Sequence, residues 1–272
     1  MFQRILRDAF VIVFGNLETV FKVCGAWFVL QSVLLLLVQA MVGGMPGETT
    51  AAAGDPVQVS PAQMLASLLM MAVGIVAAAS ISVAWHRFGL LGERPGFIHL
   101  QLGAIEGRFI VKTLLIALVA FLVLLPISIA AALLSAVIQS PVMIVILFLI
   151  ATVFVTPHLL RLYLVLPAVS VERPIGLKEA YKLGYGLGWP MIGAGIVLFL
   201  PFILVAILLQ YLSVLAGSGG LLALLIMIKL ALLNVLLQII LTVLGISVIT
   251  AAYRIAMERQ NAATQETPSN PA

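Results

Sequence analysis

Residues 113–132 read TLLIALVAFLVLLPISIAAA, a run of twenty residues without a Lys, Arg, Asp or Glu. A transmembrane helix needs about 20 consecutive, mostly apolar residues to cross the hydrocarbon layer of a bilayer. Five other stretches have a similar length and character: residues 23–42, 64–85, 142–160, 191–210 and 233–252. We therefore expect an all-α, polytopic transmembrane bundle of six spans that forms one domain over residues 1–260.

The composition of the chain supports this fold class. Hydrophobic residues make up 63% of its 272 residues and charged residues only 9%, whereas soluble domains carry roughly 25% charged residues. This composition excludes a soluble fold. The single cysteine, Cys24, also excludes an internal disulfide and a cysteine-rich metal site.

The basic residues predict how the spans are oriented. Of the 14 Lys and Arg residues, 13 lie before the first span, between the second and third, between the fourth and fifth, or after the sixth. Short connections rich in Lys and Arg stay in the cytoplasm. We therefore expect both termini to be cytoplasmic and residues 43–63 to lie outside. Because these charges flank spans instead of forming one patch, we expect membrane lipids, and no nucleic acid, as partners.

Segments beside the spans have recognisable patterns too. Over residues 2–17, apolar side chains share one helical face and charged side chains share the other, which is typical of an amphipathic helix at a membrane surface. Residues 177–185, ahead of the fifth span, repeat this pattern. We expect residues 211–232 to form a connection at the outer surface, and residues 261–272 to be a disordered cytoplasmic tail.

Polar residues within the sixth span form one stripe. Asn234, Gln238 and Thr242 follow one another at intervals of four residues, so they share a helical face. The stripe has two interpretations: it lines a pathway through the bundle, or it provides hydrogen bonds between packed helices.

Lys229 is the one basic residue on the expected outer side. If the sixth helix begins near residue 233, Lys229 lies at the outer surface, where its ammonium group reaches water. If the helix begins at residue 221 instead, Lys229 is buried without an acidic partner and Gln210 is its nearest polar neighbour. A buried charge of that kind would indicate a function.

Charged residues gather on the expected cytoplasmic side, and none of them forms a recognisable catalytic motif. Salt bridges on a solvated face are the ordinary interpretation, and an acid–base pair is the alternative. His86, His99 and His158 lack the spacing of a metal site, and no nucleotide-binding or nucleophile motif is present. We expect no enzyme activity, metal or cofactor. The residues of this interface are Arg87, Glu93, Arg94, Arg161, Glu172, Arg173, Arg254, Glu258 and Arg259.

Three passages on this side resemble a known family. They are HRFGLLGERPG from His86, HLQLGAIEGRFI from His99, and the passage from Arg161 through Pro167 to LKEAYKLGYGLGW, which ends at Trp189. They are similar to a broad family of bacterial six-span membrane proteins related to the membrane domain attached to some glycerophosphodiester phosphodiesterases. The resemblance implies an all-helical inner-membrane bundle of largely unassigned activity, and it supplies no catalytic residues.

Two functions fit these expectations. The first is a non-catalytic membrane protein that packs against a membrane-protein partner or a second copy of itself, or that organises lipid around it. The alternative is a transporter or channel-like protein for an apolar or lipid-like solute. In that case Pro126, Pro157 and Pro201 would kink three spans around a cavity, and the polar stripe would line it.

Overall fold

The structure is a computed structural model and describes the chain except for residues 43–59, 97–98, 139–140, 174, 216–219 and 266–272. Over the described residues the chain forms helices and no strand, which confirms the predicted all-α class. In chain order these are α1 (Phe2–Phe14), α2 (Leu17–Val42), α3 (Pro61–Leu91), α4 (Ala104–Ile138), α5 (Pro141–Leu162), α6 (Val165–Ser170), α7 (Leu177–Leu183), α8 (Gly188–Leu215) and α9 (Gly220–Gln265).

Six of these helices are long and apolar enough to cross a membrane: α2, α3, α4, α5, α8 and α9. Each contains one of the six runs found in the sequence and extends beyond it. The chain is therefore a multi-pass integral membrane protein. Helices continue past the apolar runs because polar and charged residues are compatible with helix once they lie outside the hydrocarbon layer.

Both ends of α3 are defined by capping residues. The hydroxyl of Ser60 accepts a hydrogen bond from the Gln63 backbone N–H (3.2 Å), and the Gln63 side chain accepts one from the Ser60 N–H (2.8 Å). This capping box satisfies two backbone donors at the start of the helix. At the other end Gly92 adopts φ 73°, a left-handed conformation that glycine tolerates and that terminates helices.

Two segments differ from the sequence-based expectation. Most of residues 211–232 is helical, because α8 continues to Leu215 and α9 begins at Gly220. The connection is therefore shorter than expected, since the leucine-rich run after Gly220 contains good helix formers and no Gly or Pro to interrupt them. α9 also continues through Gln265, into the segment predicted to be disordered, and the rest of that tail, like residues 43–59 of the first outer connection, lies outside the described residues.

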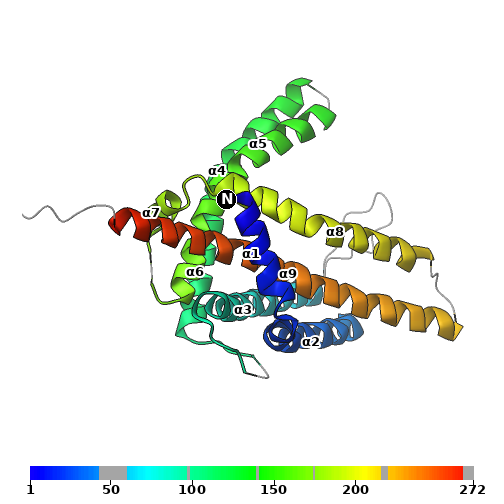
Figure 1. Cartoon of the computed structure of the whole chain (residues 1–272). Coiled ribbons are helices and arrows are strands. Elements are labelled where there is room, and N and C mark those ends of the chain that lie inside the picture. Colours follow the sequence, from blue (N-terminus) through cyan, green and yellow to red (C-terminus); the bar gives the residue numbers. More distant parts are fainter. Residues whose placement is uncertain (43–59, 97–98, 139–140, 174, 216–219, 266–272) are drawn as a thin grey trace, which may run out of the picture.

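The core lies at one end of the bundle, where α3, α5 and α9 end and α4 and α8 begin. We call this the basic end, because Arg87, Arg161 and Arg254 lie there. α1 contacts both α8 and α9 and crosses them in Figure 1. Its buried side chains are Ile5, Ala9 and Val13, which lie one turn apart on one face. α6 is buried along its whole length, and the sequence did not reveal it because its residues simply continue an apolar run.

Away from the basic end the helices separate. Of the most apolar 18 residues in α4 and in α5, only 6% are buried, and the α4–α5 hairpin stands away from α8 and α9 (Figure 1). Pro126 and Pro157 lie inside these two helices, where each removes a backbone hydrogen-bond donor. The apolar faces of the hairpin are therefore left to contact lipid.

Candidate functional site

A large apolar groove lies between α5, α8 and α9. Its volume is about 660 Å³. It lies in the angle where the α4–α5 hairpin leaves the other helices (Figure 1), so its open side faces the surroundings of the spans. The residues that shape it include Thr156 and Leu160 of α5, Gly195 and Phe199 of α8, and Thr242 and Gly245 of α9.

Beside the groove, α5 and α8 meet in a close backbone contact. A Cβ atom added at Gly188 would overlap the carbonyl oxygen of Pro157. Only glycine therefore allows the first turn of α8 to approach the proline of α5 so closely. Gly195 and Gly245 line the groove and carry no side chain to fill it.

The polar stripe of α9 leads into the groove. Thr242 lines it, whereas Gln238 and Asn234 are exposed on the same helical face, one and two turns farther from the basic end. Their hydrogen bonds run within α9: the Gln238 amide donates to Asn234 Oδ1 (3.2 Å), and the Thr242 hydroxyl donates to the Gln238 carbonyl (2.8 Å). Among the described residues the stripe bonds only within α9, and its exposed members continue the helical face on which Thr242 lines the groove.

Lys229 lies well inside a membrane-spanning helix. Because α9 begins at Gly220, Lys229 is about 13 Å along the helix axis from its start. This is the early helix start that would have buried it, yet its side chain is exposed, and so is that of Gln210 on α8. Protein does not cover Lys229, because the splayed helices leave this side of α9 open.

At the basic end, Arg87 joins the end of α3 to the end of α6. Its guanidinium donates two hydrogen bonds to the Glu93 carboxylate (2.7 and 2.8 Å) and one to the carbonyl oxygen of Ser170 (3.1 Å). Glu172 lies 3.7 Å from the same guanidinium. Arg87, Glu93 and Glu172, predicted only as members of a charged region, thus form one network.

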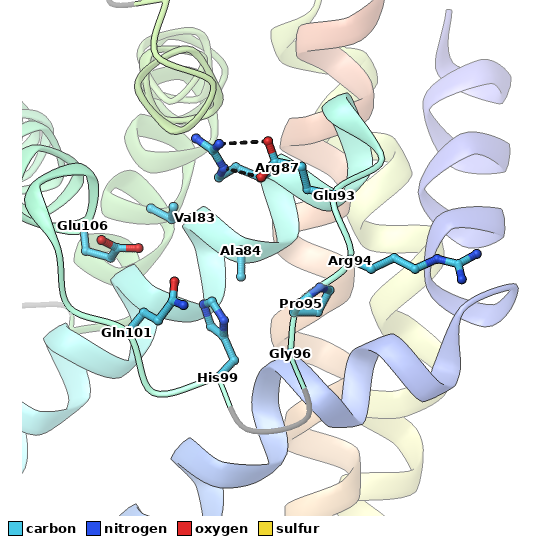
Figure 2. A pocket seen from close by; sticks show the side chains of 10 residues that line it. All are labelled: Val83, Ala84, Arg87, Glu93, Arg94, Pro95, Gly96, His99, Gln101 and Glu106. Atoms are coloured by element: carbon cyan, nitrogen blue, oxygen red, sulfur yellow. Dashed lines mark hydrogen bonds and ion pairs between the residues drawn. The ribbon is translucent and has the colours of Figure 1, made fainter.

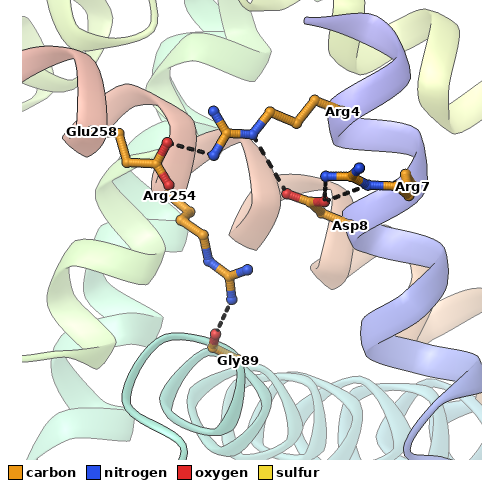
Figure 3. A network of polar contacts seen from close by, with 6 residues as sticks. All are labelled: Arg4, Arg7, Asp8, Gly89, Arg254 and Glu258. Carbon is orange, nitrogen blue, oxygen red and sulfur yellow. Dashed lines mark hydrogen bonds and ion pairs between the residues drawn. The ribbon is translucent and has the colours of Figure 1, made fainter.

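A second network ties α1 and α3 to α9 (Figure 3). Arg4 of α1 donates a 2.5 Å hydrogen bond to Glu258, and Arg254, one turn earlier on α9, donates to the carbonyl oxygen of Gly89 (2.5 Å). Asp8 lies 3.9 Å from the Arg4 guanidinium. These bonds hold α1 in place across the bundle.

The other predicted interface residues lie apart from these networks. Arg94 and Arg173 are exposed, and Arg259 donates to the backbone carbonyl of Tyr185 (3.3 Å). The Arg161 guanidinium lies over two tyrosine rings, 5.3 Å from the centre of Tyr181 and 5.5 Å from that of Tyr185. The structure therefore divides the predicted charged face into separate small contacts, and within the described ranges no group of three potential metal ligands occurs.

A set of buried polar contacts between α3 and α9 escaped the sequence analysis. The Trp85 indole N–H donates to the Ser247 hydroxyl (2.7 Å), and His86 Nδ1 lies 2.8 Å from the Thr250 hydroxyl. His86, which the sequence analysis considered only as a possible metal ligand, is buried in this contact. The spacing of Ser247, Thr250 and Arg254 along one face of α9 was the available signal, although nothing in it identifies the partner helix.

Comparison of the chain with protein-family models, with curated proteins and with solved structures finds no match. The groove, the polar stripe and the basic end are therefore the features that bear on function.

Proposed function

We propose that this chain is a non-catalytic bacterial inner-membrane protein that binds a membrane lipid in the groove between α5, α8 and α9 and so organises lipid around itself. The observation that supports this proposal most directly is the groove itself. It is apolar, it is open at the side, and it lies among helices that cross the membrane. In a bilayer the molecules that surround such an opening are lipid acyl chains.

The arrangement of charge favours a phospholipid over an uncharged solute. Leu160 lines the groove, and the next residue, Arg161, belongs to the basic end. A phospholipid with an acyl chain in the groove would have its phosphate close to this end, where Arg and Lys residues attract anionic headgroups. The same charges support our proposal that the basic end and both termini face the cytoplasm. The resemblance of the connections to a bacterial six-span family supports the inner membrane as the location.

Movement of a lipid-like solute along α9 is the second candidate. It is favoured by one observation: Gln238 and Asn234 continue the face on which Thr242 lines the groove. The polar side chains would contact the headgroup of a lipid-like solute as it moves, while its acyl chain stays among the surrounding lipid. Lys229, exposed farther along the same helix, is where such a polar face would meet an anionic group.

Filling the groove tests the lipid proposal. A Cβ atom at Gly245 would lie 3.6 Å from Phe199, an ordinary contact, so the rest of a leucine side chain would extend into the groove. Each lost carbon–carbon contact costs about 0.1–0.2 kcal/mol, and the loss of about ten would lower lipid occupancy roughly tenfold. Gly25→Leu is the matched control, because Gly25 lies in α2 with nothing within 4 Å of an added Cβ.

The measurement is native mass spectrometry of the full chain released from mild detergent. We expect phospholipid to remain bound to the wild type and to Gly25→Leu and to be depleted in Gly245→Leu. Equal occupancy in all three proteins, or none in the wild type, would overturn the proposal. Lipid scrambling by proteoliposomes that stops in the Asn234→Leu, Gln238→Leu double variant would favour the second candidate instead.

The proposed orientation has its own test. A cysteine introduced by Asp55→Cys should react with an impermeant thiol reagent in intact cells, whereas the native Cys24 is buried and should not. Protection of the introduced cysteine until the cells are opened would reverse the orientation.

A further inference from the structure

A second hollow lies at the basic end, where α3 ends and α4 begins. It is a polar pocket of about 210 Å³, bounded by the last turns of α3, the connection after it and the first turn of α4. Figure 2 shows the side chains of His99, Gln101 and Glu106 directed toward the same space, below the Arg87–Glu93 pair. This pocket shares no lining residue with the groove, so the two are separate sites that could bind different ligands.

Two side chains of this pocket are buried and keep hydrogen-bond acceptors that the protein does not use. Glu106 is only 6% exposed, and its Oε2 accepts the Gly103 backbone N–H (2.8 Å). Among the described residues its carboxylate takes part in no salt bridge, and its hydrogen bond with Gly103 uses Oε2 alone. His99 is also 6% exposed, and its Nε2 is buried without a hydrogen-bond partner.

The cations nearest the pocket do not neutralise Glu106. The guanidinium of Arg87 is held by Glu93 and by the carbonyl of Ser170. The side chain of Arg94 extends away from the pocket in Figure 2. The pocket therefore presents a buried carboxylate without a counter-charge, an arrangement that is costly unless a cation occupies the adjacent space.

His99 presents a lone pair to the same space. Burial lowers the pKa of its imidazole, although the Glu106 carboxylate and a hydrogen bond with the Ser80 backbone act in the opposite direction. The ring is consequently neutral at pH 7. Because Nε2 is the nitrogen without a partner, a ligand that satisfies it must donate a hydrogen bond if the Ser80 carbonyl accepts the Nδ1 proton.

We propose that this pocket binds a protonated primary amine, whose ammonium group donates hydrogen bonds to Glu106 and His99. An ammonium carries three donors and one positive charge, which matches a carboxylate, an imidazole nitrogen and the nearby Gln101 amide. An anion would be repelled by Glu106. A zinc ion would need three or four convergent ligands, and the pocket offers one histidine and one inward-facing carboxylate.

The amine could come from two sources that share this chemistry. One is the ethanolamine headgroup of a membrane lipid, since the pocket lies at the end of membrane-spanning helices. The other is a soluble primary amine. The two are distinguished by whether the lipid or the free compound produces the effect.

The test uses the full chain in mild detergent at neutral pH, with thermal unfolding as the readout. Ethanolamine hydrochloride should raise the Tm of the wild type, whereas choline chloride at the same concentration should not, because its quaternary nitrogen has no N–H to donate. In Glu106→Gln the apparent affinity for ethanolamine should fall about tenfold or more, as expected for a lost charge-assisted hydrogen bond. Glu179→Gln, which makes the same change on the exposed face of α7, should behave as the wild type.

A lipid arm identifies the source. In nanodiscs, a higher Tm in phosphatidylethanolamine than in phosphatidylcholine, abolished by Glu106→Gln, would assign the lipid headgroup. An effect of free ethanolamine alone would assign a soluble amine. Equal responses to ethanolamine and choline in the wild type, or an unchanged ethanolamine response in a folded Glu106→Gln protein, would overturn the proposal. If Glu106→Gln does not fold, the ethanolamine–choline comparison decides. Because the groove is tested through Gly245, either proposal can fail without the other.

Discussion

The imidazole Nδ1 of His86 in α3 and the hydroxyl oxygen of Thr250 in α9 lie 2.8 Å apart, and both side chains are buried. The Thr250 hydroxyl also donates to the Ile246 carbonyl (2.8 Å). A hydroxyl has one proton, so Thr250 accepts the hydrogen bond from His86. This relationship fixes the histidine as the Nδ1–H tautomer and joins two helices whose residues are far apart in the sequence.

Thr250→Val should destabilise the protein. It keeps the shape of the side chain and removes the acceptor, which leaves the His86 N–H buried and unsatisfied at a cost of about 1–3 kcal/mol. Thermal unfolding in detergent should show a lower Tm. Thr250→Ser, which retains the hydroxyl, should lose less. Thr264→Val is the control, because Thr264 is exposed near the end of α9, and an equal loss there would contradict the proposed role of the hydrogen bond.

The membrane-spanning helices were predictable because the cost of placing charge in hydrocarbon restricts charged residues to the ends of apolar runs. The full lengths of these helices were harder to predict from the sequence. α4 includes Arg108 and Lys112, which limit an apolar run but do not stop a helix. α6 escaped detection for the opposite reason, since Val165–Ser170 continues an apolar stretch that periodicity alone does not divide.

The candidate sites were less predictable than the fold. The stripe of Asn234, Gln238 and Thr242 could be read from spacing within one helix, yet its relation to the groove depends on how α5 departs from α8. The pocket of Glu106 and His99 depends on burial and on which neighbouring charges are already paired. Such properties arise from contacts between helices, and a single sequence does not contain the pairings.

Gly188→Ala should disrupt the junction between α5 and α8. The added methyl group would overlap the Pro157 carbonyl, and overpacking of this kind costs about 1–3 kcal/mol or more. We expect a lower Tm and a lower yield of monodisperse protein in size-exclusion chromatography. Gly107→Ala makes the same change inside α4, where nothing lies within 4 Å of an added Cβ. It should be neutral or stabilising, since alanine favours helix over glycine.

The pair of Arg4 and Glu258 should make a small, salt-dependent contribution. Both side chains are about half exposed, at 47% each, and exposed pairs of this kind contribute about 0.2–1 kcal/mol. A double-mutant cycle with Arg4→Gln and Glu258→Gln should give a coupling energy in that range at low salt and a smaller one at high salt. A coupling energy that is zero at low salt would show that α1 is held by its apolar face alone.

His99 should make the protein less stable in acid. Burial lowers the pKa of its imidazole below the ordinary value of 6.5, with Glu106 and the Ser80 backbone opposing that shift. Between the folded and the unfolded pKa the unfolded chain binds more protons, so stability rises with pH in this window. As pH falls below about 6.5, the contribution of the neutral ring is progressively lost, until the folded pKa is reached. Tm measured from pH 7.5 to 5 should therefore decline more steeply in the wild type than in His99→Gln, which has no imidazole to titrate. The control for this measurement is His158→Gln, because His158 is exposed and bonded to the Tyr181 hydroxyl. Its Tm should fall with pH as steeply as that of the wild type. Parallel profiles of Tm against pH for the wild type and His99→Gln would show that burial of His99 does not contribute to the acid sensitivity.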